Sequence, residues 1–323
     1  MNTASVSFTT DIEYELQLLE QRLLQAVPME NSTVADKVRE LVRAGGKRLR
    51  PSLTFYASRI FEADLESTVA VAAGIEMLHT ATLIHDDLVD NAQERRGVST
   101  LNAHFPLGLV VLTGDMLFAA AAELVAEANH VGIVRSFART LGEICGGEML
   151  QAQTKHTLVP IEEYYKRIYG KTGSLFRAAA EAGAMLGTDD ADAVHAMSEY
   201  GRLLGMAFQI IDDALDFTSS TKRMGKPIGH DLREGVITLP VLLYHARQEH
   251  LNGTFQRVIA GTAREDQIED TISAIKSSGV IDEAINIARD FAARARESLN
   301  TLPDSPARQQ LINLTRFATE RQY

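Results

Sequence analysis

The chain has 323 residues, of which 45% are hydrophobic and 23% are charged, as in an ordinary soluble globular protein. Its 43 acidic and 32 basic side chains give a formal net charge of −11, which argues against nucleic acid as a partner for the surface as a whole. A single cysteine, Cys145, excludes an intrachain disulfide and a cysteine-rich zinc site.

The beginning of the chain and its most apolar stretch bear on where the protein works. The first 20 residues carry four acidic side chains and no arginine, which argues against a targeting peptide. Residues 105–126 are the most apolar stretch, but Asp115 and Glu123 interrupt it, and a charge near the centre of a membrane span costs about 2.5 to 3.5 kcal/mol. We therefore predict a buried core helix there, no stable membrane insertion, and a cytoplasmic protein.

Long proline-free stretches predict helices through most of the chain. They are rich in Ala, Leu, Glu and Arg, and they span residues 52–105, 107–159 and 161–226. A proline inside a helix costs about 3 kcal/mol, so its absence favours helices in these stretches. In the first of them, Ile75, Leu78, Thr82 and Asp86 recur at the three- and four-residue spacing of a helix.

Turn signals are few and separate the predicted helices. They lie at residues 43–48, 95–99, 224–231 and 302–306. No linker, repeat or low-complexity segment divides the chain. We therefore predict an all-α protein of one domain, residues 1–323, with ten or more helices.

Two acidic motifs share the pattern D-D-x-x-D, and each follows an apolar run. The first, "DDLVD", spans residues 86–90 after "MLHTATLI", and the second, "DDALD", spans residues 212–216 after "MAFQII". On a helix, residues four apart lie one turn apart on the same face. The outer aspartates of each motif therefore form an aligned pair, while the middle ones lie about 100° around the helix and are weaker candidates for binding.

A lone motif of this kind is more simply a solvated helix end, but two copies in matching apolar contexts favour a binding function. Carboxylate oxygens without histidine partners suit Mg²⁺, which in such sites bridges to phosphate groups. A carboxylate about 4 Å from a phosphate oxygen is repelled by roughly 4 kcal/mol at an effective dielectric near 20. The motifs therefore predict a polyanion that is held through divalent cations.

Local basic clusters stand out against the acidic background of the chain. Each lies beside glycine or a turn signal, and arginine and lysine are the usual donors to phosphate oxygens. The clusters are Lys47 and Arg50 in "GGKRLRP", Arg95 and Arg96 in "ERRG", Lys171 and Thr172 in "YGKTG", and Lys226 in "GKPIGHD". Together with the acidic motifs they indicate two phosphate-bearing ligands, one on the metals and one held by Lys and Arg without metal.

In order and spacing, these motifs resemble those of the trans-isoprenyl diphosphate synthases. The likeness covers residues 40–245 densely and includes "GGKRLRP", "HTATLIHDDLVDNAQERRG", "YGKTGSLF", "FQIIDDALDF" and "GKPIGHDLREGVITLP". It is greatest with the long-chain polyprenyl diphosphate synthases. The resemblance implies an all-helical bundle around a central cavity, a homodimer, and head-to-tail condensation of isopentenyl diphosphate with an allylic diphosphate in the presence of Mg²⁺.

The resemblance also implies a role for each matching residue. Asp86, Asp90 and Asp212 would bind Mg²⁺, with Asp216 and the middle aspartates, Asp87 and Asp213, as supporting or water-mediated contacts. The allylic diphosphate would face Arg95, Lys171, Thr172, Gln209 and Lys226, and isopentenyl diphosphate would be held by Lys47, Arg50, His79 and Arg96. Catalysis would rest on Asp86, Asp90, Lys171, Asp212 and Lys226.

The residues before the first acidic motif bear on the length of the product. Ala81 and Thr82 are small, whereas short-chain members of the family close the pocket near these positions with bulky aromatic residues. A tail that descends toward Leu78 and Ile75 would cover 11 residues of helix, or about 16 Å. We therefore predict a product of roughly C30 to C45, with a C20 geranylgeranyl diphosphate synthase as the main alternative, and Ala81, Thr82, Leu78 and Ile75 as the residues that set the length.

Two other classes remain as alternatives. A terpene cyclase would also be all-α and rich in aspartate, but the second metal motif of that class reads N-D-x-x-S/T-x-x-x-E, which "IDDALDFTSS" does not match. A non-catalytic subunit of a heteromeric synthase would be a binding module. Such subunits have eroded aspartate motifs, whereas both motifs are whole here.

Overall fold

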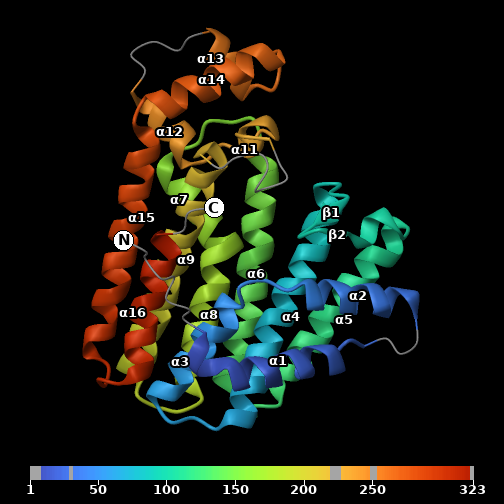
Figure 1. The fold of residues 1–323 in the computed structure, drawn as a ribbon, viewed down its shortest axis with the longest axis vertical. Helices are drawn as coiled ribbons and strands as arrows, with labels where there is room; N and C mark the ends of the chain where they lie inside the picture. Colours follow the sequence, from blue (N-terminus) through green and yellow to red (C-terminus); the bar gives the residue numbers. More distant parts are fainter. Residues whose placement is uncertain (1–8, 29–31, 219–226, 248–252, 321–323) are drawn as a thin grey trace. The chain divides into compact units, whose positions relative to one another are not determined.

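The computed structural model describes residues 9–28, 32–218, 227–247 and 253–320 (Figure 1). The described residues contain more than ten helices and one hairpin of two short strands, so the predicted all-α class is confirmed. Contacts between residues divide the chain into two compact units. The first unit is Met1–Leu141, Leu175–Gly201 and Leu299–Leu311, and the second unit is Gly142–Ser174, Arg202–Ser298 and Ile312–Tyr323.

The first unit is built largely from the N-terminal helices. It contains α1 (Glu13–Gln25), α2 (Thr33–Ala44), α3 (Leu49–Ile60), α4 (Leu65–Val89), the strands β1 (Glu94–Arg95) and β2 (Val98–Ser99), and α5 (Leu107–Ala126). It also contains most of α8 (Ser174–Met185) and the first parts of α6 (Val131–Gln153), α9 (Ala191–Thr218) and α16 (Pro306–Thr319).

The helix α4 carries the first acidic motif and confirms the predicted helical period. It begins after Asp64, whose side chain accepts a hydrogen bond from the Ser67 N–H at 2.8 Å. It ends before Asp90, and the following Asn91 has a left-handed backbone with φ of 52°. Most of its residues before the acidic motif are buried, because α4 is enclosed by α1, α3 and α5.

The helices α4 and α5 lie side by side (Figure 1). They approach each other closely at two glycines. A Cβ atom on Gly74 of α4 would lie 2.5 Å from Cγ2 of Val125, and one on Gly114 of α5 would overlap the ring of His85. His85 also contacts the Val111 carbonyl oxygen through Nε2 at 3.1 Å. The two glycines fix the register of one helix against the other, and His85 packs against α5.

The face of α5 away from α4 differs from the prediction of a buried core helix. Leu107, Leu112 and Met116 expose 65%, 60% and 39% of their surface, respectively. Among the described residues, α4 and α5 are long and apolar enough to cross a membrane, yet 72% of the most apolar window of α4 is buried, against 44% for α5. Because α4 covers only one side of α5, the other side stays open in a single chain.

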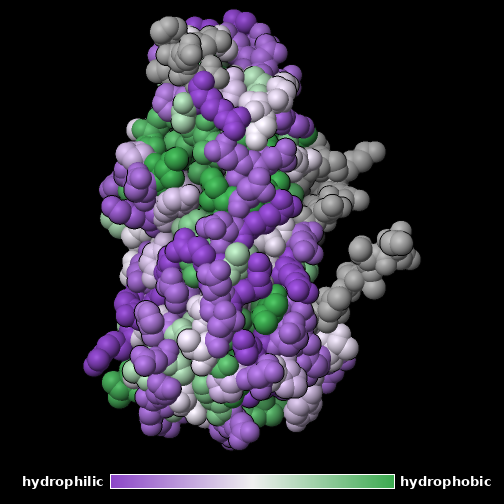
Figure 2. Space-filling model, turned by 90° about the vertical axis from the view of Figure 1, so that its left-hand side faces the viewer, coloured by the Kyte–Doolittle hydropathy of each residue, from purple (hydrophilic) through white to green (hydrophobic). Residues whose placement is uncertain are grey.

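The second unit has its own apolar core, built mainly by the C-terminal helices. Its elements are α7 (Ile161–Ile168), a π-helical turn (Tyr169–Gly173), α11 (His230–Arg233), α12 (Leu239–Ala246), α13 (Gly253–Ile259), α14 (Glu265–Ser277) and α15 (Val280–Ser298), together with the later parts of α6, α9 and α16. The core includes Ile210, Phe217, Ile237, Ile275 and Val280. Hydrophilic side chains cover most of the face that Figure 2 shows, as the net charge of −11 leads one to expect.

The predicted turns at residues 43–48, 95–99 and 302–306 are confirmed. The second of them is a hairpin in which Arg95 pairs with Val98, and Arg96 and Gly97 both have positive φ, of 55° and 78°. Two central residues with positive φ form a type I′ turn, which matches the twist of the short strands. Of the fourth predicted turn, residues 224–226 lie outside the described residues.

Candidate active site

The outer aspartates of the first motif lie at the C-terminal end of α4. The Asp90 N–H donates to the Asp86 carbonyl oxygen at 2.8 Å, so the helical geometry extends through both residues. Their side chains therefore lie one turn apart on the same face, as predicted. The Asp86 side chain is half-buried and that of Asp90 is exposed, which leaves both carboxylates within reach of a ligand.

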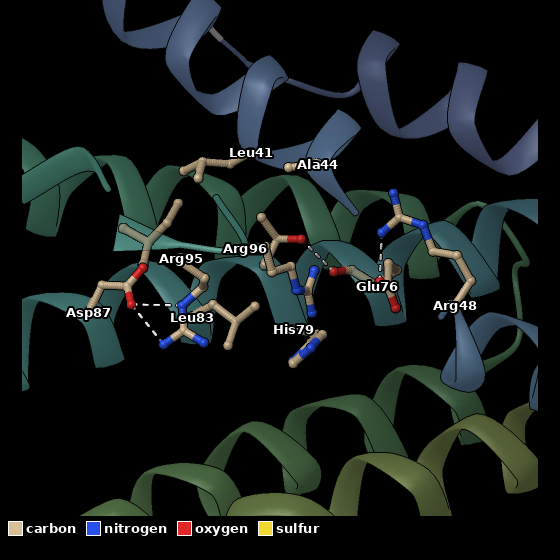
Figure 3. Close-up of a pocket in the computed structure, with 11 residues that line it drawn as sticks. Leu41, Ala44, Arg48, Glu76, His79, Leu83, Asp87, Arg95 and Arg96 are labelled. Atoms are coloured by element: carbon tan, nitrogen blue, oxygen red, sulfur yellow. Dashed lines mark hydrogen bonds and ion pairs between the residues drawn. The ribbon is translucent and has the colours of Figure 1, made fainter. Parts of the chain in front are cut away.

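The middle aspartate of this motif has a different environment. Asp87 is only 3% exposed, and its Oδ1 lies 2.7 Å from both Nε and Nη2 of Arg95 (Figure 3). The pair joins the end of α4 to the β1–β2 hairpin. Arg95, predicted to face a diphosphate, is thus engaged with a carboxylate in this structure.

The first two aspartates of the second motif repeat this division of roles. Asp212 is half-buried, whereas Asp213 is 3% exposed and accepts hydrogen bonds from the Tyr164 hydroxyl and from Nε2 of Gln209, each at 2.8 Å. Thr172 donates to Oε1 of Gln209 at 2.7 Å. Burial, followed by the charge of Asp231, raises the pKa of Asp213 to about 7. Two residues predicted to face the diphosphate, Thr172 and Gln209, therefore lie in contact with each other.

Asp216 closes the second motif and holds the start of α11. It is 6% exposed, and its carboxylate accepts the backbone N–H groups of His230 at 3.1 Å and Asp231 at 3.2 Å. Gly229 before them has a left-handed backbone with φ of 68°. The role of Asp216 at a metal site stays a prediction, and the structure adds a structural role to it.

Lys171 lies in the π-helical turn between α7 and α8. Its Nζ is 2.7 Å from Oε1 of Glu148 on α6. The turn approaches α6 so closely that a Cβ atom on Gly147 would lie 2.5 Å from the Lys171 backbone nitrogen. The predicted site residue Lys226 lies outside the described residues.

A cavity of about 30 Å³ in the first unit brings together polar side chains from the turn before α3, from α4 and from the hairpin (Figure 3). Its lining includes Arg48, Glu76, His79, Asp87, Arg95 and Arg96. Nη1 of Arg96 donates to the Gly45 carbonyl oxygen, which ties the hairpin to the glycine turn before α3. His79, Arg95 and Arg96, which the sequence placed at diphosphates, therefore share one small polar cavity.

The His79 imidazole is neutral in this setting. Burial lowers the pKa of His79 well below its usual value, and the positive charges of Arg50, Arg96, Arg95 and Arg48 lower it further. A neutral imidazole can donate one hydrogen bond to an anion and accept another.

The two remaining cationic candidates flank the start of α3. Lys47 is exposed. The guanidinium carbon of Arg50 lies 4.7 Å from the ring centroid of Phe176, within the first unit. The face of Phe176 thus fixes the direction of Arg50.

The residues predicted to set the product length lie along α4 before the acidic motif. Ala81 and Leu78 are fully buried, and the half-buried Thr82 donates its hydroxyl to the His79 carbonyl oxygen at 2.7 Å. Ile75 lines a second cavity of about 10 Å³ in the first unit. The other walls of this cavity are mainly apolar and include Val71, Val125, Phe137 and Leu175.

The donor chemistry of the site fits Mg²⁺. The outer positions offer carboxylates with no histidine or thiolate, and such oxygen ligands suit a hard divalent cation. Within the ranges that the structure describes, no group of three or more His, Cys, Asp or Glu side chains is arranged to hold a metal by itself. One or two carboxylates for each ion, completed by water and phosphate oxygens, is the usual pattern for Mg²⁺.

The sequence left several contacts of the site unassigned. Glu76 and Glu148 each hold a basic residue of the site, and Tyr164 holds Asp213. Glu76 follows an apolar run whose pattern indicates only a core helix. Glu148 lies in "GGEMLQ", where the glycine pair is the one signal of a close approach.

Comparison with known proteins defines the class. The chain belongs to the polyprenyl synthetase family, whose sequence pattern matches residues 31–276, and it is therefore a prenyltransferase. It is 35% identical to the all-trans-nonaprenyl-diphosphate synthase (geranyl-diphosphate specific) of Rhodobacter capsulatus, over 98% of this chain and 99% of the relative. It is also 35% identical to the heptaprenyl diphosphate synthase component 2 of Geobacillus stearothermophilus, over 99% of both chains.

The solved structures agree with this assignment. The polyprenyl synthase of Caulobacter crescentus CB15, crystallised with calcium and isoprenyl diphosphate, has a TM-score of 0.93 and 35% sequence identity to this chain. The similarity covers 99% of this chain and 98% of that one. The family that the sequence motifs indicated is confirmed.

Proposed function

We propose that this protein is a Mg²⁺-dependent trans-polyprenyl diphosphate synthase that adds isopentenyl diphosphate head-to-tail to an allylic diphosphate. One observation carries the proposal. In both D-D-x-x-D motifs the middle carboxylate is buried and held by neighbouring side chains, while the first carboxylate remains partly exposed. The buried partners orient each motif, and the partly exposed first carboxylates, Asp86 and Asp212, are the proposed metal ligands.

The condensation needs a leaving group, an apolar surface and no side-chain nucleophile. The bond between C1 of the allylic substrate and oxygen breaks, and its electron pair leaves with diphosphate. The double bond of isopentenyl diphosphate then forms the new carbon–carbon bond, and a proton is lost to the released diphosphate. When bound, Mg²⁺ neutralises the charge that develops on the leaving diphosphate.

The proposed donor side chains fall into two groups, one for each diphosphate. Lys171, Thr172, Gln209, Arg95 and Lys226 are the donors proposed for the allylic diphosphate, and Lys and Arg stabilise charge that develops on the leaving oxygen. The second diphosphate is assigned to Lys47, Arg50, His79 and Arg96. For this group the support is the polar cavity that contains His79 and Arg96, and the turn that carries Lys47.

We propose a long-chain product of roughly C30 to C45. The small residues Ala81 and Thr82 and the buried apolar path toward Leu78 and Ile75 support this length, and long-chain synthases are among the relatives. A C20 product is the alternative within the same reaction class.

The exposed apolar face of α5 supports a homodimer. Leu107, Leu112 and Met116 form an open apolar surface, and such surfaces mark interfaces. Asp115 on the same helix and the net charge of −11 disfavour an anionic membrane as the cover. We therefore propose a second copy of the chain as the occupant, and with it a cytoplasmic protein without stable membrane insertion.

We also propose that residues 1–323 form a single domain. The family match and the relatives include residues of both compact units, which supports this proposal.

One assay tests the function. The purified chain is incubated with Mg²⁺, an allylic diphosphate and labelled isopentenyl diphosphate, and the extracted products are separated by chain length. We expect linear products of C30 to C45, and no incorporation when EDTA removes the metal, because the carboxylates then repel the substrate. A cyclic product would favour a terpene cyclase. Incorporation only after a partner chain is added would favour a subunit of a heteromeric synthase.

A further inference from the structure

Arg48 lies between two residues assigned to isopentenyl diphosphate, yet it points away from solvent. It precedes the first residue of α3 and has a left-handed backbone with φ of 48°, which is uncommon for a residue with a side chain. Lys47 and Arg50 lie on either side of it. Whatever holds Arg48 therefore also sets the path of the turn that carries Lys47 and Arg50.

The guanidinium group of Arg48 is held from three directions. Its Nε and Nη2 contact the two carboxylate oxygens of Glu20 on α1 at 2.6 and 3.0 Å. Its Nη1 lies 2.7 Å from Oε1 of Glu76 on α4 (Figure 3). Nη2 also donates to the Val42 carbonyl oxygen at 2.7 Å. Such a forked set of contacts uses the planar geometry of arginine, which lysine cannot reproduce.

Glu76 connects this turn to the cavity. It is only 4% exposed, and it lies one helical turn before His79, with which it lines the cavity. A carboxylate this deep among apolar residues is costly unless it is paired. The other side of the turn is held by Arg96, whose Nη1 donates to the Gly45 carbonyl oxygen. The turn is therefore fixed to α4 and to the hairpin at once.

We infer that the Glu76–Arg48 pair is a positioning device for the isopentenyl diphosphate site, an inference that rests on the proposed function. Glu76 and Arg48 do not touch the substrate. They hold residues 45–50 in the one conformation that brings Lys47 and Arg50 to the same anion as His79. A displacement of about 1 Å in such a site can cost 100-fold in rate, so loss of the pair should show in the kinetics with isopentenyl diphosphate.

The chain offers a matched control for this inference. Arg59, near the other end of α3, forms an ion pair with the buried Glu15 on α1. This second pair also joins α3 to a neighbouring helix, but it lies more than two turns of α3 from Arg50. Loss of either pair destabilises the first unit, whereas only loss of the Glu76–Arg48 pair disturbs the turn.

The experiment compares Glu76→Gln, Arg48→Lys and Glu15→Gln with the wild type. The melting temperature, kcat, and the KM for each substrate are measured. We expect Glu76→Gln and Arg48→Lys to raise the KM for isopentenyl diphosphate by about 10- to 100-fold and to leave the KM for the allylic diphosphate within about twofold. Glu15→Gln lowers the melting temperature but changes neither KM.

Each outcome decides between the inference and its alternatives. An unchanged KM for isopentenyl diphosphate in Glu76→Gln, or equal increases in both KM values, overturns the positioning role. If Glu76→Gln does not fold, the half-exposed Glu20 is changed to Gln, and an unaltered KM for isopentenyl diphosphate in that variant overturns it as well. A wild-type enzyme that condenses no isopentenyl diphosphate under any condition refutes the proposed function itself and the inference with it.

Discussion

Neighbouring aspartates in one motif do different work because a helix turns by about 100° at each residue. Asp86 faces outward at the end of α4, whereas Asp87 faces Arg95. The same separation distinguishes Asp212 from Asp213. The first motif therefore has two proposed metal ligands with an anchor between them, and in the second motif Asp216 is an anchor as well.

Substitution of each aspartate in turn tests this division. Asp86→Asn removes a proposed metal ligand, so we expect kcat to fall by about 10²- to 10³-fold while the melting temperature stays close to that of the wild type. Asp87→Asn leaves Arg95 without its carboxylate partner, so we expect a lower melting temperature with a smaller loss of kcat. Steady-state kinetics and thermal unfolding measure both. Equal effects of the two substitutions on both quantities would contradict the division.

The neutral His79 predicts how stability depends on pH. Its pKa in the folded protein lies below that in the unfolded chain, near 6.5, because of burial and the surrounding arginines. The unfolded chain therefore binds more protons as the pH falls below about 6.5, and stability decreases there by at most about 1.4 kcal/mol per pH unit from this group.

Urea unfolding of the wild type and of His79→Gln between pH 7.5 and 5.5 measures this contribution. The difference in unfolding free energy between the two proteins should move in favour of the variant as the pH falls. A difference that does not change with pH would show that His79 titrates normally in the folded protein.

At the scale of elements, the helix α4 could be predicted from the spacing of its apolar residues, and so could the turns around it. The partners of its polar residues could not. Glu76 pairs with Arg48, which lies in the turn before α3. No local sequence pattern indicates a contact between residues 28 positions apart. The π-helical turn at Lys171 was likewise visible only as a glycine-rich segment, because its shape depends on the close approach of Gly147.

The path along α4 leads to a prediction about product length. Thr82→Phe and Ala81→Phe place an aromatic ring one turn before Asp86, so we expect both to shift the product from C30–C45 to C20 or shorter. Chromatography of the dephosphorylated products measures the shift. Ala191→Phe, at an exposed position at the start of α9, serves as the control and should leave the product unchanged. An unaltered product length in both α4 variants would contradict the proposed path.

At the scale of the whole molecule, the apolar face of α5 favours self-association, and the net charge of −11 disfavours an anionic membrane as the alternative cover. A two-fold symmetric dimer brings the same face of both chains together and needs no second complementary surface. The open leucines of α5 would then be covered without any contact with lipid. The sequence alone suggested a buried helix at this point, because composition cannot show which side of a helix its neighbours cover.

Leu112→Glu tests the dimer, because a charge in the centre of an apolar interface is strongly unfavourable. We expect the wild type to sediment as a dimer and the variant as a monomer. Tyr14→Glu changes a side chain that is 62% exposed on α1 and should leave the dimer intact. A wild type that is monomeric in solution but floats with lipid vesicles through Leu112 would show that α5 meets a membrane instead.

The two close glycine contacts between α4 and α5 have a consequence for the spread of product sizes. They lie at Gly74 and at His85, and so bracket Ile75, Leu78, Ala81 and Thr82. If α4 could shift by one turn against α5, the depth of the proposed path would vary, and the product would be a mixture of chain lengths. Because the contacts at Gly74 and His85 hold α4 against α5 on both sides of these four residues, elongation should stop at a narrowly defined chain length.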